Sequence, residues 1–194
     1  MGKITAFMSM SLDGFIAGPK GENKPDRELE ALDRLSDWMF RGKTDSEAVE
    51  FQERLFKPIG AVVMGRRIFD LGVEPWGDNP VYHAPVFVLS HRPKEKVVKQ
   101  GRTTYTFVPD GAESALKQAK AAAGNKDIRV VGGANVVQQF IKAGWLNEIE
   151  IHLIPILLGE GIRLFDHIDK SIELERIQVT EAPDVTHLKF RIVK

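Results

Sequence analysis

The sequence contains no cysteine in its 194 residues, which excludes disulfides, thiolate metal ligands and cysteine nucleophiles. It also has no excess of charge, because 27 lysines and arginines balance 27 aspartates and glutamates. Without a basic field, we expect no nucleic-acid partner and no membrane-surface partner. No run approaches the ~18 apolar residues of a membrane span, and the first residues lack the apolar region of a signal peptide. We therefore expect a cytoplasmic protein.

Several familiar site motifs are missing as well. The sequence has no G-x-G-x-x-G dinucleotide fingerprint, no Walker A motif and no G-x-S-x-G nucleophile elbow. The five histidines are scattered, and no pair of them has the helical spacing, with a carboxylate, that is typical of a metal site. We therefore expect no metal ion, no serine hydrolase chemistry and no Rossmann-type cofactor site.

What remains is an ordinary globular composition, with 43% hydrophobic and 28% charged residues. We find no internal repeat, linker or low-complexity tract. The length suits one domain with a sizeable core. The sequence therefore predicts a single domain over residues 1–194.

Buried-type strands alternate with amphipathic helices through the first 150 residues. Strands are predicted at residues 4–11, 60–64, 85–90, 103–108 and 127–131, and helices at 26–39, 46–56, 68–72, 111–123 and from 134 to Gly144. Asp110 with Glu113 predicts a capping box before the helix at 111–123, and residues 15–19 are expected to form a loop.

The last part of the chain has the alternation of antiparallel strands. In residues 148–155, Glu148, Glu150 and His152 alternate with apolar residues, which indicates one solvated face. Residues 171–180 and 186–193 are predicted to form a closing hairpin. Together these elements predict an α/β three-layer sandwich with a mixed, mainly parallel central sheet and a C-terminal antiparallel hairpin.

Three turns at predicted strand ends have the composition of anion sites. The first, Gly132-Gly133, precedes a helix whose first N–H groups attract phosphates; the alternative is a tight turn. The second, Gly65-Arg66-Arg67, adds two positive charges, and the alternative is a pair of solvated arginines. The third is Ser90-His91-Arg92, which could hold a phosphate monoester or be a plain polar turn.

In parallel α/β sheets, ligands bind beyond the carboxyl ends of the strands. All three turns are predicted to lie there. Together they indicate a ligand with several phosphates, in which two turns bind a pyrophosphate and the third a separate monophosphate. NADPH has this distribution of charge.

The sequence resembles the dihydrofolate reductase-like superfamily, and more closely its branch containing the C-terminal reductase domain of bacterial riboflavin biosynthesis. The matching segments occur in the family's order and cover nearly the whole chain: Met8–Ala17, Val63–Arg67, Val88–Pro93, Val130–Asn135, Pro155–Gly161 and Leu164–Phe165. No deaminase domain precedes them, so the chain resembles a stand-alone member of that branch. The family often dimerises, and the resemblance therefore implies a homodimer.

The resemblance implies that NADPH binds across the sheet. The nicotinamide would be bordered by Ser9, Ile16 and Ala17. The other residues implied to bind the cofactor are Gly65, Arg66, Arg67, Leu89, Ser90, His91, Arg92, Gly132, Gly133, Ala134, Asn135 and Val136. Hydride transfer then needs a positioned small-molecule substrate and a source of one proton.

Three acids are candidates for proton donation or substrate anchoring. Asp13 could instead form a turn, Asp33 could be a charge at the edge of its helix, and Glu160 could be a solvated loop acid. The expected activity is an NADPH-dependent reductase for a small heterocyclic, pteridine- or pyrimidine-like, or carbonyl or imine substrate. Two alternatives remain: a pathway enzyme such as a 5-amino-6-(5-phosphoribosylamino)uracil or dihydrofolate reductase, and a non-catalytic NADPH-binding protein.

Overall fold

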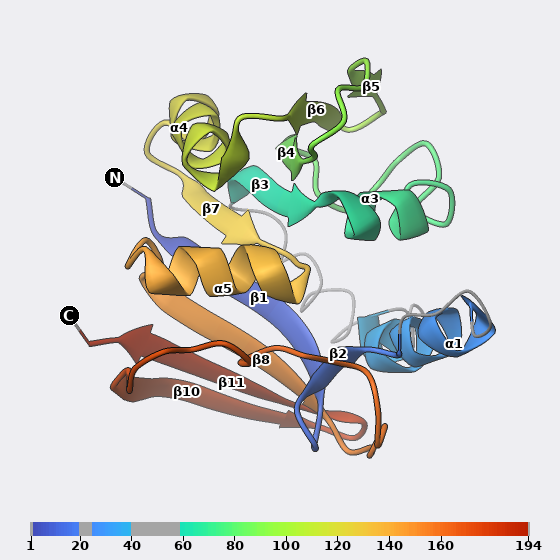
Figure 1. Cartoon of the computed structure of the whole chain (residues 1–194), viewed down its shortest axis with the longest axis vertical. Coiled ribbons are helices and arrows are strands. Elements are labelled where there is room, and N and C mark those ends of the chain that lie inside the picture. The colour runs from blue at the N-terminus through green and yellow to red at the C-terminus, as the bar shows by residue number, and fades with distance from the viewer. Residues whose placement is uncertain (1, 20–24, 40–58, 194) are drawn as a thin grey trace.

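The computed structural model describes residues 2–19, 25–39 and 59–193. The elements in chain order are β1 (Ile4–Ser11), β2 (Phe15–Ala17), α1 (Pro25–Ser36), the 3₁₀ helix η1 (Asp37–Met39), β3 (Ile59–Gly65), α3 (Arg66–Gly72), β4 (Pro85–Leu89), β5 (Val97–Val98), β6 (Thr104–Val108), α4 (Gly111–Ala123), β7 (Asp127–Val130), α5 (Ala134–Lys142), β8 (Glu148–Ile154), β9 (Ile162–Arg163), β10 (Leu174–Ala182) and β11 (Val185–Ile192) (Figure 1). The helix predicted at 46–56 lies outside the described residues.

One large sheet organises the chain, with the strand order β10-β11-β8-β1-β7-β3-β4-β6-β5. The strands from β8 to β6 pair in parallel, whereas β10, β11 and β5 pair antiparallel. β1 lies near the middle of the sheet, where Ile4 pairs with Ile128 of β7 and Ser11 pairs with Ile154 of β8. The predicted mainly parallel sheet with a C-terminal antiparallel hairpin is confirmed.

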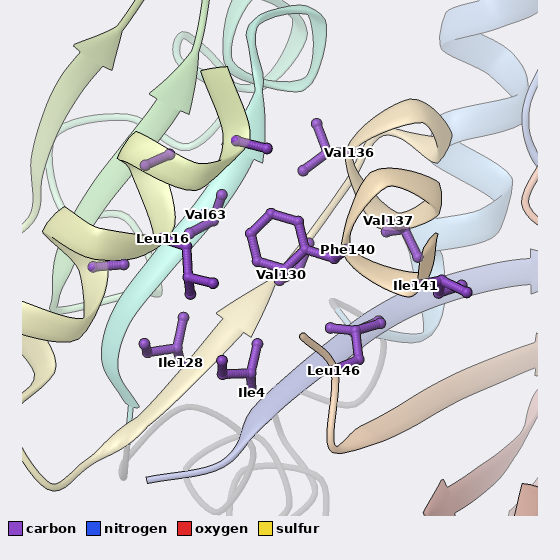
Figure 2. Close-up of a cluster of buried hydrophobic side chains, with 14 of the residues drawn as sticks. Ile4, Val63, Leu116, Ile128, Val130, Val136, Val137, Phe140, Ile141 and Leu146 are labelled. Carbon is purple, nitrogen blue, oxygen red and sulfur yellow. The ribbon is translucent and has the colours of Figure 1, made fainter. Parts of the chain in front are cut away.

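Helices cover both faces of the sheet. Successive residues of a strand point to opposite sides, so apolar residues in a row present an apolar surface on each face. On β3, Val63 faces a cluster that includes Leu116 of α4 and Phe140 of α5 (Figure 2), whereas Val62 faces a second cluster with Phe69 of α3. The apolar stripe of α5 therefore fixes this helix against the sheet, and its first turn lies next to the carboxyl end of β7 (Figure 1).

The predicted solvated face of β8 is wrong. Glu148 is only 2% exposed and His152 is 0% exposed. β1 and β11 flank β8 on both sides, so Glu148 forms ion pairs with Lys3 and Lys189, while the His152 ring packs against Trp38. The alternating polarity of this strand thus comes from side chains that are buried against neighbouring strands and Trp38, rather than from contact with water.

Two smaller predictions also fail. Residues 15–17 form β2, which pairs antiparallel with β9, where a loop was expected. The Asp110 side chain makes no capping hydrogen bond to α4, so the predicted capping box is absent. At the other end of α4, Gly124 has a φ of +58° and follows Ala123, where the helix ends as predicted.

Candidate functional site

A cleft of about 740 Å³ opens where β3, β4 and β7 end. Residues from all three predicted turns line it: Gly65, Arg66, Arg67, Leu89, Ser90, His91, Gly133, Ala134, Asn135 and Val136. Parallel pairing brings the turns together, because β3 lies between β4 and β7 in the sheet. The cleft has the size of a pocket for a small organic ligand or cofactor.

The Gly132-Gly133 turn leads from β7 into α5. Gly132 has a φ of +116°, which favours glycine, and its carbonyl oxygen accepts a hydrogen bond from the Gly65 N–H at 2.7 Å. Gly133 is extended, with a φ of −80°, and a Cβ placed there would meet no atom within 4 Å. Gly133 therefore leaves open space in front of the first N–H groups of α5, as an anion-binding turn requires.

Arg66 is held in place rather than freely solvated. Its Nε lies 2.8 Å from both carboxylate oxygens of Asp70, one turn later on α3. Its Nη1 donates to the Ser90 Oγ at 3.3 Å, which links the second predicted turn to the third. The terminal nitrogens of Arg66 are thus directed toward the Ser90 turn.

Arg67 forms a bidentate ion pair with Glu28 of α1, a residue that the sequence argument missed. Both residues line the cleft. The Glu28 side chain is 5% exposed and that of Arg67 is 51% exposed, so the arginine covers the carboxylate. The hydrogen bonds that Arg67 donates to Glu28, together with the negative charge of that carboxylate, raise the pKa of Arg67.

The burial pattern of α1 explains why Glu28 was missed. In the sequence, Leu29, Leu32 and Leu35 recur at helical spacing and suggest the inward face of this helix, yet Leu29 is 45% exposed. The buried residues are Glu28, Ala31 and Leu35. These three residues have the i, i+3, i+7 spacing of one helical face. The face of α1 that packs inward is therefore rotated by one residue from the face expected from the leucines. Its first residue is Glu28, a carboxylate.

Asp13 points to the loop after β8 and does not line the cleft. Its carboxylate accepts hydrogen bonds from Ser11 Oγ and from the backbone N–H groups of Leu158 and Gly159. Burial opposes ionisation, but these hydrogen bonds outweigh it and lower the pKa of Asp13 to about 2. Asp13 is therefore ionised at neutral pH, where it holds the loop and has no proton to donate.

Replacing Asp13 with asparagine is expected to remove a stabilisation that depends on pH. The pKa of Asp13 falls from 3.8 to about 2 on folding, so its contribution is complete above the higher value and is lost as the pH drops through the lower one. Urea unfolding across this range should show a difference between the parent and the variant that is constant above about pH 5 and shrinks toward pH 2. A difference that persists unchanged at pH 2 would exclude the carboxylate as its source.

The other predicted acids also lie away from the large cleft. Asp33 is exposed and does not line it. Glu160 forms an ion pair with Arg27 at 2.5 Å beside a smaller cavity of about 230 Å³. The catalytic roles of Asp13, Asp33 and Glu160 stay predictions, and the arrangement of the described residues favours Glu28 over all three.

Three predicted cofactor residues do not line the cleft: Ser9, Arg92 and Gly132. The Ser9 Oγ accepts a hydrogen bond from the Trp38 Nε1 at 2.9 Å. Arg92 contributes its backbone, because its N–H and carbonyl group both bond the Ser90 Oγ. Gly132 lies behind Gly133 in the turn, where its carbonyl oxygen accepts the hydrogen bond from Gly65. The cofactor roles of these three residues stay predictions.

Ile16 and Ala17 of β2 form an apolar wall of the cleft, together with Leu32 of α1 and Ile68 and Leu71 of α3. The cleft thus combines an apolar end with arginines, a serine and a helix N-terminus elsewhere.

Within residues 2–19, 25–39 and 59–193, no His, Asp and Glu side chains are grouped to hold a metal ion, and no helix is long and apolar enough to cross a membrane.

Known proteins resemble this chain over nearly its full length. Residues 2–188 match the family model of the RibD C-terminal domain. Two uncharacterised proteins of Bacillus subtilis (strain 168) are similar: YyaP is 26% identical over 181 residues, covering 90% of this chain and 86% of YyaP, and YwjB is 27% identical over 177 residues, covering 89% and 87%.

Solved structures share the same arrangement of strands and helices. A protein from Shewanella sp. PV-4, provisionally named as a riboflavin biosynthesis protein, superposes with a TM-score of 0.70 at 26% identity over 100% of both chains. Dihydrofolate reductase from Enterococcus faecalis, complexed with NADP(H) and RAB-propyl, gives a TM-score of 0.61 at 16% identity over 100% of this chain and 98% of the enzyme. The chain has a dihydrofolate reductase-like fold and belongs to the RibD C-terminal domain family.

Proposed function

We propose that the chain is an NADPH-dependent reductase that transfers hydride to a small heterocyclic, pteridine- or pyrimidine-like, or carbonyl or imine substrate. The observation that carries this proposal is the convergence of three anion-ready turns and one apolar wall in a single cleft. NADPH matches that distribution, with phosphates spread along its length and an uncharged nicotinamide at one end. Membership of a reductase family and the NADP(H) complex of the Enterococcus enzyme support it.

Each part of the cofactor has a matching group in the cleft. The 2′-phosphate and adenosine would lie near Arg66 and Ser90, and the pyrophosphate would lie against the first turn of α5. The nicotinamide would lie against Ile16 and Ala17, which are 6% and 5% exposed. When bound, the cofactor supplies the hydride, and the chain holds the reacting carbon against it in a dry site.

Glu28 is the residue that we assign to substrate anchoring. It is the buried carboxylate of the described cleft, and it lies between the apolar residue Leu32, one turn later on α1, and the guanidinium of Arg67. In such a pair the carboxylate accepts hydrogen bonds and the neighbouring guanidinium donates them. That pair suits a ring with adjacent N–H and carbonyl groups, or a polar carbonyl compound.

A fluorescence titration with NADPH, followed by a substrate panel, tests the proposal. The panel should hold dihydrofolate, pterins, 5-amino-6-(5-phosphoribosylamino)uracil and dicarbonyl compounds. We expect saturable NADPH binding and oxidation of NADPH by at least one panel class. Absence of NADPH binding would contradict the proposal, whereas tight binding without turnover would favour the non-catalytic alternative.

Replacing Gly133 with valine should weaken NADPH binding without unfolding the protein. The φ and ψ angles of Gly133 are those of an extended residue, and a Cβ there meets no protein atom within 4 Å, so there is space for a side chain to begin at this position. Its methyl groups would occupy the space in front of α5 where the pyrophosphate approaches. We expect the Kd to rise at least roughly tenfold, equivalent to about 1.4 kcal/mol.

The measurement pairs NADPH titration with a thermal melt of each variant. Gly133→Ala is the graded control, because one methyl group fills less of the cleft. An unchanged Tm with a graded loss of affinity supports the assignment. NADPH affinity of Gly133→Val equal to that of the parent would rule out this turn as the pyrophosphate site.

A further inference from the structure

The closing hairpin of β10 and β11 forms one edge of the large sheet, and its two faces differ in polarity. Residues that are paired across antiparallel strands point to the same face. The polar face holds the pairs of Glu175 with Arg191, Gln178 with Lys189 and Thr180 with His187. The opposite face holds the apolar pairs of Leu174 with Ile192 and Val179 with Leu188. The hairpin is therefore amphipathic.

The apolar face of the hairpin continues the face of the sheet that α5 covers. One row of paired residues crosses it: Met8 of β1, Ile151 of β8, Leu188 of β11 and Val179 of β10. Met8 and Ile151 belong to the core cluster and are 6% and 3% exposed, whereas Val179 is 43% exposed. Figure 1 shows α5 over β1, with β11 and β10 beyond it. The row thus begins in the core and ends on an uncovered surface.

Exposed apolar side chains gather on β10, where Leu174, Ile177 and Val179 all face water. β10 pairs only with β11 among the described strands, so its outer edge is open as well. An exposed apolar strip on an edge strand is typical of a surface against which another chain packs. The bulge between Arg176 and Gln178 interrupts the regular pairing of β10 and disfavours edge-to-edge extension of the sheet. A partner is therefore expected on the apolar face.

Two charged residues, Arg176 and Glu181, also lie on the apolar face, one on each side of Val179. Their pairing with β11 places both on the face of Val179. Neither forms an ion pair with any described residue, whereas Glu175 on the polar face pairs with Arg191 at 2.8 Å. The apolar face therefore has a positive charge at one end, a negative charge at the other and an apolar centre.

Such a face is complementary to itself. A two-fold axis near the middle of β10 would lay the strand antiparallel over the same strand of a second copy. Arg176 of each copy would then lie opposite Glu181 of the other, so that the attractive contact occurs twice. The charge pattern favours a second copy over a partner of one charge sign, such as an anionic surface.

We propose that the apolar face of the hairpin binds a second copy of this chain about such a two-fold axis. With nine residues in β10, the contact covers roughly 30 Å by 10 Å. This is smaller than the ~800 Å² per partner of a standard interface, so the dimer is reversible, with a Kd on the order of micromolar. The inference does not depend on the proposed reductase activity, because no residue of the hairpin lines the cleft.

Sedimentation equilibrium, over protein concentrations from well below to well above micromolar, tests the interface. The variants are Val179→Glu, Arg176→Glu and Glu181→Arg, with a thermal melt of each to establish that it is folded. Gln178→Glu is the matched control, since it adds the same charge at the neighbouring position on the polar face, across from Lys189. We expect the parent to dimerise and each of the three variants to raise the Kd at least roughly tenfold, with the control within about twofold.

An equimolar mixture of Arg176→Glu and Glu181→Arg tests the two-fold pairing itself. Each variant alone opposes like charges, whereas the mixed dimer joins opposite charges at both contacts. We expect the mixture to dimerise with nearly the parent affinity. A parent that stays monomeric throughout the range, a folded Val179→Glu variant that dimerises like the parent, or a mixture that stays monomeric would each overturn the inference.

Discussion

Replacing Arg67 with methionine is expected to lower the free energy of unfolding by about 2–3 kcal/mol. Methionine preserves the length and the apolar stem of the side chain, so the main change is the loss of the guanidinium. The Glu28 carboxylate, only 5% exposed, then remains buried without its counter-ion. Half of Arg67 faces water, which places the expected effect at the lower end for buried pairs.

Urea unfolding of Arg67→Met, Glu28→Gln and the double variant gives the coupling energy of the pair. We expect the double variant to be more stable than Arg67→Met alone, because a neutral amide tolerates burial better than an unpaired carboxylate. Arg66→Met is the matched control, since its partner Asp70 is 46% exposed and such pairs contribute below about 1 kcal/mol. Equal losses for Arg66→Met and Arg67→Met would show that Glu28 does not depend on Arg67.

Replacing Phe140 with alanine should destabilise the chain by about 3–5 kcal/mol. Phe140 is fully buried at the centre of the cluster between α5, α4 and the sheet (Figure 2), and its ring meets Trp145 edge-on at a centroid distance of 5.3 Å. Truncation leaves a cavity that rigid strands on one side cannot close. Because α5 also borders the cleft, the loss should loosen the Gly133 turn and weaken ligand binding.

Thermal unfolding measures this effect, and a fall in Tm on the order of 10 °C is expected for a chain of this size. Phe140→Leu should retain most of the stability, because it removes less volume. Gln139→Ala, at an exposed position on the same helix, should change stability by less than about 0.5 kcal/mol. A Phe140→Ala protein within about 1 kcal/mol of the parent would contradict the packing shown by the cluster.

The sequence was sufficient to predict the sheet and the three turns, because these depend on local signals. Short apolar runs identify buried strands, and Gly132-Gly133 and Gly65 mark the ends of two of them. Once the sheet is parallel, the carboxyl ends of its strands share one edge. The common position of the turns therefore follows from topology, without any side-chain detail.

The partners of the charged residues could not be read in this way. Arg67 and Glu28 are 39 positions apart and meet only because α1 and α3 approach each other in the fold. A one-residue rotation of α1 decides whether a leucine or Glu28 faces inward, and spacing alone permits both. Of the three acids predicted from the sequence, the one on this helix was consequently Asp33, which the structure leaves exposed.

β8 shows the same limit in a strand. Its alternation was read as a solvated face, since a polar residue at every second position usually indicates water. Burial of Glu148 depends on Lys3, which is 145 positions away, and on Lys189 of the last strand. Charge pairing across such separations is a property of the assembled sheet and has no local signature.

The central place of β1 also has a consequence for the order in which the chain can fold. β1 is made well before the two strands that flank it, because Ile4 pairs with Ile128 and Ser11 with Ile154. At ~5–20 residues per second, its two partners emerge on the order of ten seconds later. Until then β1 has both hydrogen-bonding edges open, so the middle of the sheet cannot close early and folding depends on contacts of high sequence separation. A nascent chain stalled before residue 127 should therefore expose β1 and require a chaperone to stay soluble.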